Sequence, residues 1–344
     1  MTDPLDQTLA SVREDFAVAT FPDGGLLLHL LSGDFFPLDG VTARVWEMVN
    51  QGGGGDAMLA GIASALHVPA HDASVLLANV LRQATALRDH RPAAPPVFFE
   101  DERALSLRDG TRTLMSLDKR SLSLIVTDDL RQRSNEDMAA AFRVFVPKVF
   151  ARWFPLAMHA SAVGIGDRTI LFCGESGAGK TTTARTLADE ITGVRLYSED
   201  VVVFRDQGGV LMMIEGAEPA IQAWMLEVTA TLIERREPSH EVGDLQRALD
   251  AAPGRLPIHK AIFLDADRRT GDHWILGPLS PAATLSRLFL HSFLHSPDPV
   301  ALRNHLRVCR VLASQIGAAE ARAVPAGLPA LRSSSRAQIE TIAG

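Results

Sequence analysis

Residues 169–190 read TILFCGESGAGKTTTARTLADE, and three local signals follow one another in them. Residues 169–173 are apolar or β-branched, which predicts a short buried strand. Residues 174–181 match the glycine-rich pattern of a phosphate-binding loop that ends in lysine and threonine. Residues 182–190 predict a helix that begins directly after the loop. A strand, a loop and a helix in this order predict an α/β domain with an anion site at the helix N-terminus.

The loop supplies what a bound triphosphate requires. Its glycines let the backbone N–H groups point inward, and the helix N-terminus adds positive potential. Lys180, which we expect to be exposed, reaches the outer phosphates, and the Thr181 hydroxyl binds Mg²⁺. ATP and Mg²⁺ are therefore the expected ligands. The expected nucleotide contacts are Gly174, Glu175, Ser176, Gly177, Ala178, Gly179, Lys180, Thr181 and Thr182.

A phosphoryl-transfer site also needs a carboxylate, and the chain offers two places for one. Residues 194–198 predict a strand that ends in Glu199 and Asp200. Residues 261–264 are four apolar residues that run into Asp265, which is the usual form of a metal-binding strand end. The local pattern alone favours Asp265.

Three segments together resemble the HPr kinase/phosphorylase superfamily, whose fold is related to that of phosphoenolpyruvate carboxykinase. They are residues 159–163 (HASAV), the loop 174–181 and residues 197–202 (YSEDVV), within a likeness that covers about residues 97–325. The resemblance implies that His159 lies on the strand before the loop, and that an acidic pair supplies the catalytic base and helps to hold the metal.

That resemblance moves our expectation from Asp265 to the acidic pair. The expected catalytic residues are His159, Lys180, Glu199 and Asp200, and the expected metal ligands are Thr181 and Asp200. Glu199 stands where the family has aspartate, so the choice of base between Glu199 and Asp200 is left open. The family's downstream signature for phosphorolysis is not found in the chain.

The first ninety residues predict a separate small domain. Residues 26–29 and 35–38 predict a hairpin, and helices are expected over residues 41–50, 56–66 and 71–86, which is a winged-helix pattern. Residues 92–96 read PAAPP, which cannot continue a helix and predicts a linker. We therefore expect an α+β domain over residues 1–91 and a P-loop kinase domain over residues 97–344.

Residues 21–89 resemble the PqqD-type domains, which bind leader segments of ribosomally made peptides. The likeness rests on LLLHLLSGDFFPLD at 26–39 followed by TARVW at 42–46. It implies a peptide or protein partner that adds as a strand to the exposed edge of the hairpin. The alternative is a plain winged-helix module that contacts DNA or another protein.

Composition limits which other classes of protein the chain can belong to. The 344 residues carry a net charge of −7, which argues against a broad nucleic-acid surface. The sequence predicts neither a signal peptide nor a spanning helix, so we expect a cytoplasmic protein. Its two cysteines predict buried thiols rather than a disulfide framework. Association between copies of the chain is left open.

The leading hypothesis is an ATP-dependent kinase that phosphorylates a hydroxyl, serine above all, on a ribosomally made peptide held by the N-terminal domain. One alternative is a kinase for a small-molecule hydroxyl. The other is a nucleotide-dependent switch or chaperone that transfers nothing.

Overall fold

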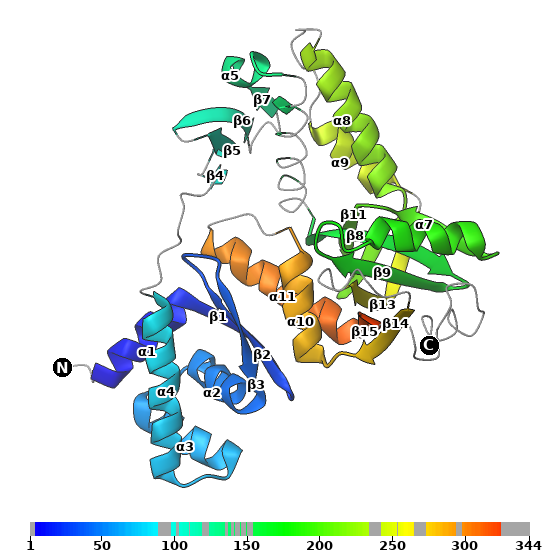
Figure 1. The fold of residues 1–344 in the computed structure, drawn as a ribbon. Coiled ribbons are helices and arrows are strands. Elements are labelled where there is room, and N and C mark those ends of the chain that lie inside the picture. The colour runs from blue at the N-terminus through cyan, green and yellow to red at the C-terminus, as the bar shows by residue number, and fades with distance from the viewer. Residues whose placement is uncertain are drawn as a thin grey trace. The chain divides into compact units, whose positions relative to one another are not determined.

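The computed structural model places most of the chain in two compact units (Figure 1). The first unit comprises residues 1–95, 280–289 and 296–313, and the second comprises residues 96–279, 290–295 and 314–344. Within them the structure describes residues 4–88, 98–100, 103–109, 111–118, 124–134, 137–138, 141, 145, 149, 154–233, 242–252, 254–264, 273–293 and 298–324.

The first unit contains the predicted hairpin as part of a three-stranded sheet. Its elements are α1 (Pro4–Asp15), β1 (Phe16–Phe21), β2 (Gly24–His29), β3 (Phe35–Asp39), α2 (Gly40–Gln51), α3 (Gly55–Leu66) and α4 (Ala70–Arg88). The hairpin β2–β3 and the three helices after it confirm the local predictions. α1 and β1 were not predicted. Because the strand order is β1-β2-β3, the first hairpin strand, β2, is the central strand rather than an edge.

Local signals explain why α2 begins where it does. The Asp39 carboxylate accepts hydrogen bonds from the backbone N–H groups of Val41 and Thr42, both at 2.9 Å, and so caps the helix. These bonds and one from the Thr42 hydroxyl lower the pKa of Asp39. The capped helix buries Val45 and Trp46 in the apolar core of the unit.

Two late helices also belong to the first unit. These are α10 (Pro281–His291), of which residues up to 289 belong here, and α11 (Pro299–Gln315), of which residues up to 313 do. The backbone N–H of Ala282 donates to the Asp23 carboxylate at 3.2 Å, and the Arg303 guanidinium donates to the Phe16 carbonyl at 3.1 Å. Both helices were expected to belong to the domain at residues 97–344, because local patterns in the sequence do not show such long-range bonds.

The second unit starts with a small antiparallel sheet. Its strands are β4 (Phe98–Glu100), β5 (Ala104–Asp109), β6 (Arg112–Asp118) and β7 (Leu124–Val126), paired in this order and followed by α5 (Asp128–Arg131). The apolar patterns of residues 97–99, 104–107 and 122–127 predict three of these strands, and β6 was not predicted. The sequence of residues 135–151 predicts a helix, and the described positions 137, 138, 141, 145 and 149 are helical. The linker expected at residues 92–96 lies outside the described residues.

The functional part of the second unit is an eight-stranded sheet. Its members are β8 (Leu156–Ile165), β9 (Arg168–Gly174), β10 (Val194–Ser198), β11 (Val201–Gln207), β12 (Val210–Ile214), β13 (Arg255–Leu264), β14 (His273–Pro278) and β15 (Gly317–Val324). The helices α7 (Lys180–Glu190), α8 (Ala217–Ile233) and α9 (Val242–Ala251) complete it. β8 and β13 each pair with three other strands, and the sheet contains both parallel and antiparallel pairs. With its helices the unit is α/β, as expected.

The pairings of β8 assemble the site. β8 lies antiparallel to β9, with Ala160 opposite Cys173, and antiparallel to β11, with His159 opposite Val201. The end of β9 and the start of β11 are therefore brought to the same stretch of β8. β13 runs parallel to β9, with Leu264 opposite Gly174.

The two cysteines and the hydrophobicity of the helices bear on two further predictions. Cys173 and Cys309 are free and buried, as predicted, and burial raises the pKa of Cys173 to about 12, which keeps that thiol protonated. Across the described part of the chain, no helix combines the length and the apolar character that a bilayer crossing requires.

Candidate phosphoryl-transfer site

The glycine-rich loop joins β9 to α7 as predicted, and its backbone requires glycine at two positions. A Cβ on Gly174 would lie 2.7 Å from the Leu264 carbonyl oxygen, so no side chain fits between the loop and β13. Gly179 caps α7 at φ 93°, a left-handed conformation that other residues adopt at a cost. The loop therefore has the strand, turn and helix geometry on which an anion site at a helix N-terminus depends.

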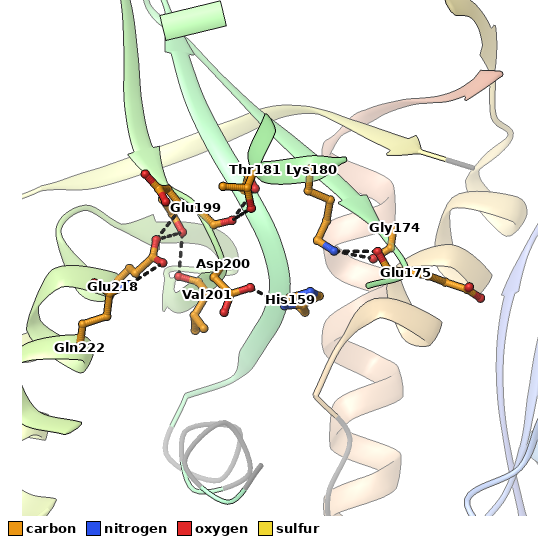
Figure 2. A network of polar contacts seen from close by, with 12 residues as sticks. His159, Gly174, Glu175, Lys180, Thr181, Glu199, Asp200, Val201, Glu218 and Gln222 are labelled. Carbon is orange, nitrogen blue, oxygen red and sulfur yellow. Dashed lines mark hydrogen bonds and ion pairs between the residues drawn. The ribbon is translucent and has the colours of Figure 1, made fainter. Parts of the chain in front are cut away.

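Lys180 lies inside this loop rather than in solvent. Its side chain is 5% exposed, and its ammonium donates to the carbonyls of Gly174 and Glu175, both at 3.0 Å (Figure 2). Burial lowers the pKa of Lys180, and the nearby Asp200 carboxylate opposes that shift. The expectation of an exposed lysine was wrong, because the loop folds over its side chain.

Thr181 begins the helix and points its hydroxyl at the acidic turn between β10 and β11. Its Oγ1 donates to the Glu199 carbonyl at 3.0 Å, and the Ser161 hydroxyl donates to the same oxygen at 2.6 Å. With its proton committed to a carbonyl, the Thr181 oxygen keeps its lone pairs for another partner.

His159 and Asp200 form a pair beside the loop. The His159 Nδ1 lies 2.9 Å from the Asp200 Oδ1, and the two side chains are 35% and 59% exposed (Figure 2). The hydrogen bond from His159 holds the pKa of Asp200 below its usual range; burial acts in the opposite direction, and the charges of His159 and Lys180 lower it further. Asp200 is therefore an ionised and reachable carboxylate near neutral pH.

Glu199 faces a different partner. Both of its carboxylate oxygens are held by Arg185 of α7, at 2.9 Å from Nε and 2.5 Å from Nη2. This two-pronged pair raises the pKa of Arg185. The two neighbouring acids thus have separate partners, Arg185 for Glu199 and His159 for Asp200.

A buried carboxylate, Glu218 on α8, holds the acidic turn from behind. It is 5% exposed, and its Oε2 accepts from the backbone N–H of Glu199 and, at 2.8 Å, from the Ser198 hydroxyl. Its Oε1 accepts from the Gln222 amide at 3.0 Å. Glu218 holds the N–H of Glu199 and Thr181 holds its C=O, so the backbone is clamped on both sides of the Glu199 Cα, directly before Asp200 (Figure 2).

We expect Glu218→Gln to lower the free energy of unfolding by roughly 1 to 3 kcal/mol, because a buried charged acceptor is replaced by a neutral group with one donor too many. Urea unfolding followed by circular dichroism measures this loss. Glu190→Gln, at an exposed position on α7, is the matched control and should change stability little. Equal stability of both variants would show that the clamp contributes nothing.

The donor set around Thr181 and Asp200 fits Mg²⁺. A hydroxyl oxygen with free lone pairs and one ionised carboxylate match an ion that keeps most of its waters and takes few protein ligands. Among the described residues, no group of three or more histidine, cysteine, aspartate or glutamate side chains could hold a metal by itself. Such a site therefore depends on phosphate oxygens from a substrate. Asp265, the alternative acid, lies outside the described residues.

Sequence reasoning missed Ser161, Arg185, Ser198 and Glu218. Two signals were available: Ser161 is two residues after His159 on one strand and so shares its face, and Arg185 is four residues after Thr181 on one helix face. Glu218 had no such signal, because the whole β11–β12 hairpin separates it from Glu199 in the chain.

Comparisons with known proteins add little to this geometry. No protein-family model matches the chain, and no curated protein matches it. A solved structure of the Hpr(Ser) kinase/phosphatase from Coxiella burnetii is 15% identical, with a TM-score of 0.20, and the match covers 45% of this chain and 96% of that one. Likeness at this level does not assign the chain to a family, so its function has to follow from the site.

Proposed function

We propose that this protein is an ATP-dependent phosphotransferase that moves the γ-phosphoryl group of ATP to a hydroxyl. The observation that carries the proposal is the His159–Asp200 pair, 2.9 Å apart, beside a glycine-rich loop that encloses Lys180. A loop of this kind binds phosphates, and an ionised carboxylate next to it is what a hydroxyl acceptor needs to lose its proton. A simple binding site for an anion would not need the second feature.

In this proposal Lys180 and the loop N–H groups bind the outer phosphates and stabilise the charge that develops there. Lys180 leaves the carbonyls of Gly174 and Glu175 when a phosphate offers it a stronger, charged acceptor. Mg²⁺, held by Thr181 and Asp200, would supply further neutralisation of the phosphate charge.

Asp200 is the base in this proposal, and His159 positions it. The acceptor hydroxyl gives its proton to the Asp200 carboxylate as its oxygen bonds to phosphorus and the bond to ADP breaks. Glu199 is a poorer base because Arg185 holds both of its oxygens. Its role is structural, tying the acidic turn to α7.

The acceptor that we propose is a serine hydroxyl on a ribosomally made peptide, held by the first unit. The three-stranded sheet followed by three helices supports this role, because an open sheet edge can take an extended peptide as a further strand. A small-molecule acceptor and a switch without transfer are the competing outcomes. Labelled ATP with seryl peptides, with and without free serine, separates the three.

The His159–Asp200 pair makes a pH-dependent prediction. In His159→Phe the ring volume stays but the hydrogen bond is lost, so the pKa of Asp200 rises. Since the ionised carboxylate is active above its pKa and is lost as the pH falls through it, the acid limb of the kcat/KM profile should move to higher pH. Glu199→Gln, the control, should leave that limb in place; an unmoved limb in His159→Phe would remove His159 from the mechanism.

A further inference from the structure

The outer edge of β1 in the first unit faces a row of arginines on α11. Arg303 donates to the carbonyl of Phe16 at 3.1 Å, and Arg310 donates to the carbonyl of Thr20 at 3.2 Å. Both carbonyls therefore point away from β2. Because backbone groups alternate along an antiparallel strand, the N–H and C=O of Val18 also point outward, between the two arginines.

Arginines hold the outward carbonyls on either side of Val18, and the outward backbone groups of Val18 itself form a short gap between them. Among the described residues, none makes a hydrogen bond to its outward N–H. Arg307 lies between Arg303 and Arg310 on the same helix and is exposed. Among the described residues its guanidinium bonds only the Asn304 side chain, at 3.3 Å from Nε and 3.0 Å from Nη2. The gap and the Arg307 guanidinium line one hollow of about 210 Å³.

The charge of this hollow is not balanced nearby. Among the described residues, no carboxylate lies within ion-pair distance of Arg303, Arg307 or Arg310. Three positive charges stay together here on a chain whose net charge is −7. An acidic partner would gain from all three, and a basic one would be repelled.

We propose that this hollow, between β1 and α11, is a docking surface for an acidic, extended peptide segment. The segment pairs its backbone with Val18 and places a glutamate or aspartate side chain against Arg307. At about 210 Å³ the hollow is smaller than the ~300 Å³ at which small-molecule pockets begin, so it fits a side chain rather than a nucleotide. Because Val18 directs both an N–H and a C=O outward, it favours a peptide backbone, which offers an acceptor and a donor, over nucleic-acid phosphates, which only accept.

This inference rests on the proposed peptide partner and names the part of the first unit that receives it. It differs from the hairpin edge expected from the sequence. β2 is the central strand of the sheet, so the hairpin offers only β3 as an edge, and Pro37 there has no N–H to donate.

The test is direct binding to the full chain, without nucleotide, of a short fluorescein-labelled peptide of alternating valine and glutamate. Fluorescence anisotropy should show binding that weakens with added salt and becomes at least about tenfold weaker in Arg307→Glu. A valine–lysine peptide should bind Arg307→Glu better than it binds the unaltered chain. Arg82→Glu, on exposed α4 surface, should leave the affinity unchanged.

A second probe tests the backbone pairing without altering the protein. N-methylation of the central residues of the same peptide removes the N–H groups that would donate to the Val18 carbonyl and puts methyl groups against the strand edge, so it should abolish binding. Equal affinity of Arg307→Glu and Arg82→Glu, or tighter binding of a single-stranded oligonucleotide than of the peptide, would overturn the proposal. Because no ATP is present, a failure of phosphoryl transfer would leave this result unaffected.

Discussion

Lys180→Met should weaken ATP binding by at least about a hundredfold and remove turnover with it, because the charge that faces the outer phosphates is lost. Methionine keeps the apolar stem that fills the loop, whereas alanine would empty a position that is 5% exposed. Isothermal titration with ATP and Mg²⁺ measures the affinity. ATP affinity should be lost while β9 and α7, the strand and helix on either side of the loop, stay folded.

The control for this variant is Lys260→Met. Lys260 lies on β13 opposite Ile170, near the start of β9, whereas the loop begins at the other end of that strand. The same chemical change there should leave ATP affinity unchanged. Unfolding curves of both variants should be compared, because Lys180 bonds two loop carbonyls. Unimpaired ATP binding by a folded Lys180→Met protein would remove the loop from the account.

Asp200→Asn should slow phosphoryl transfer by about a hundredfold to ten-thousandfold, because an amide cannot accept the proton of the acceptor hydroxyl. Binding of ATP measured without Mg²⁺ should change far less, since Lys180 and the loop are untouched and the proposed metal ligand Asp200 is not then engaged. Asparagine keeps the size of the side chain and an oxygen that His159 can still donate to. Single-turnover transfer from γ-labelled ATP separates the chemical step from binding.

Glu199→Gln is the matched variant, one residue away. It breaks the pair with Arg185 but leaves the His159–Asp200 pair, so its transfer rate should fall much less. A greater loss in Glu199→Gln than in Asp200→Asn would assign the base to Glu199. Asp265→Asn should have a smaller effect than Asp200→Asn; the reverse order would favour the acid chosen by the local strand pattern.

Local signals were enough for the loop and for the acidic turn. The left-handed cap at residue 179 favours glycine, and the buried strand before the loop is built from an apolar run, so both are visible in the sequence. The adjacency of His159 and Asp200 followed from a family resemblance, and the register of β8 against β11 brings them together. Nothing local distinguishes the two acids.

The remaining features depend on contacts between distant segments. Arg185 on α7 occupies the Glu199 carboxylate, and Glu218 on α8 holds the backbone of the acidic turn. Arg303 and Arg310 of α11 donate to carbonyls of β1, which lies nearly three hundred positions earlier in the chain. A side chain's polar partner at such separation has no periodic signature, so patterns predict the elements but not these bonds.

The most direct test of the central claim is to follow the γ-phosphoryl group itself. The unaltered chain and Asp200→Asn would be incubated with Mg²⁺, γ-labelled ATP and a pool of seryl peptides that carry acidic segments. The account predicts label in an acid-stable phosphoester of the peptide with the unaltered chain, and almost none with Asp200→Asn. Label that stays in ATP, or that appears as inorganic phosphate equally fast with both proteins, would contradict it.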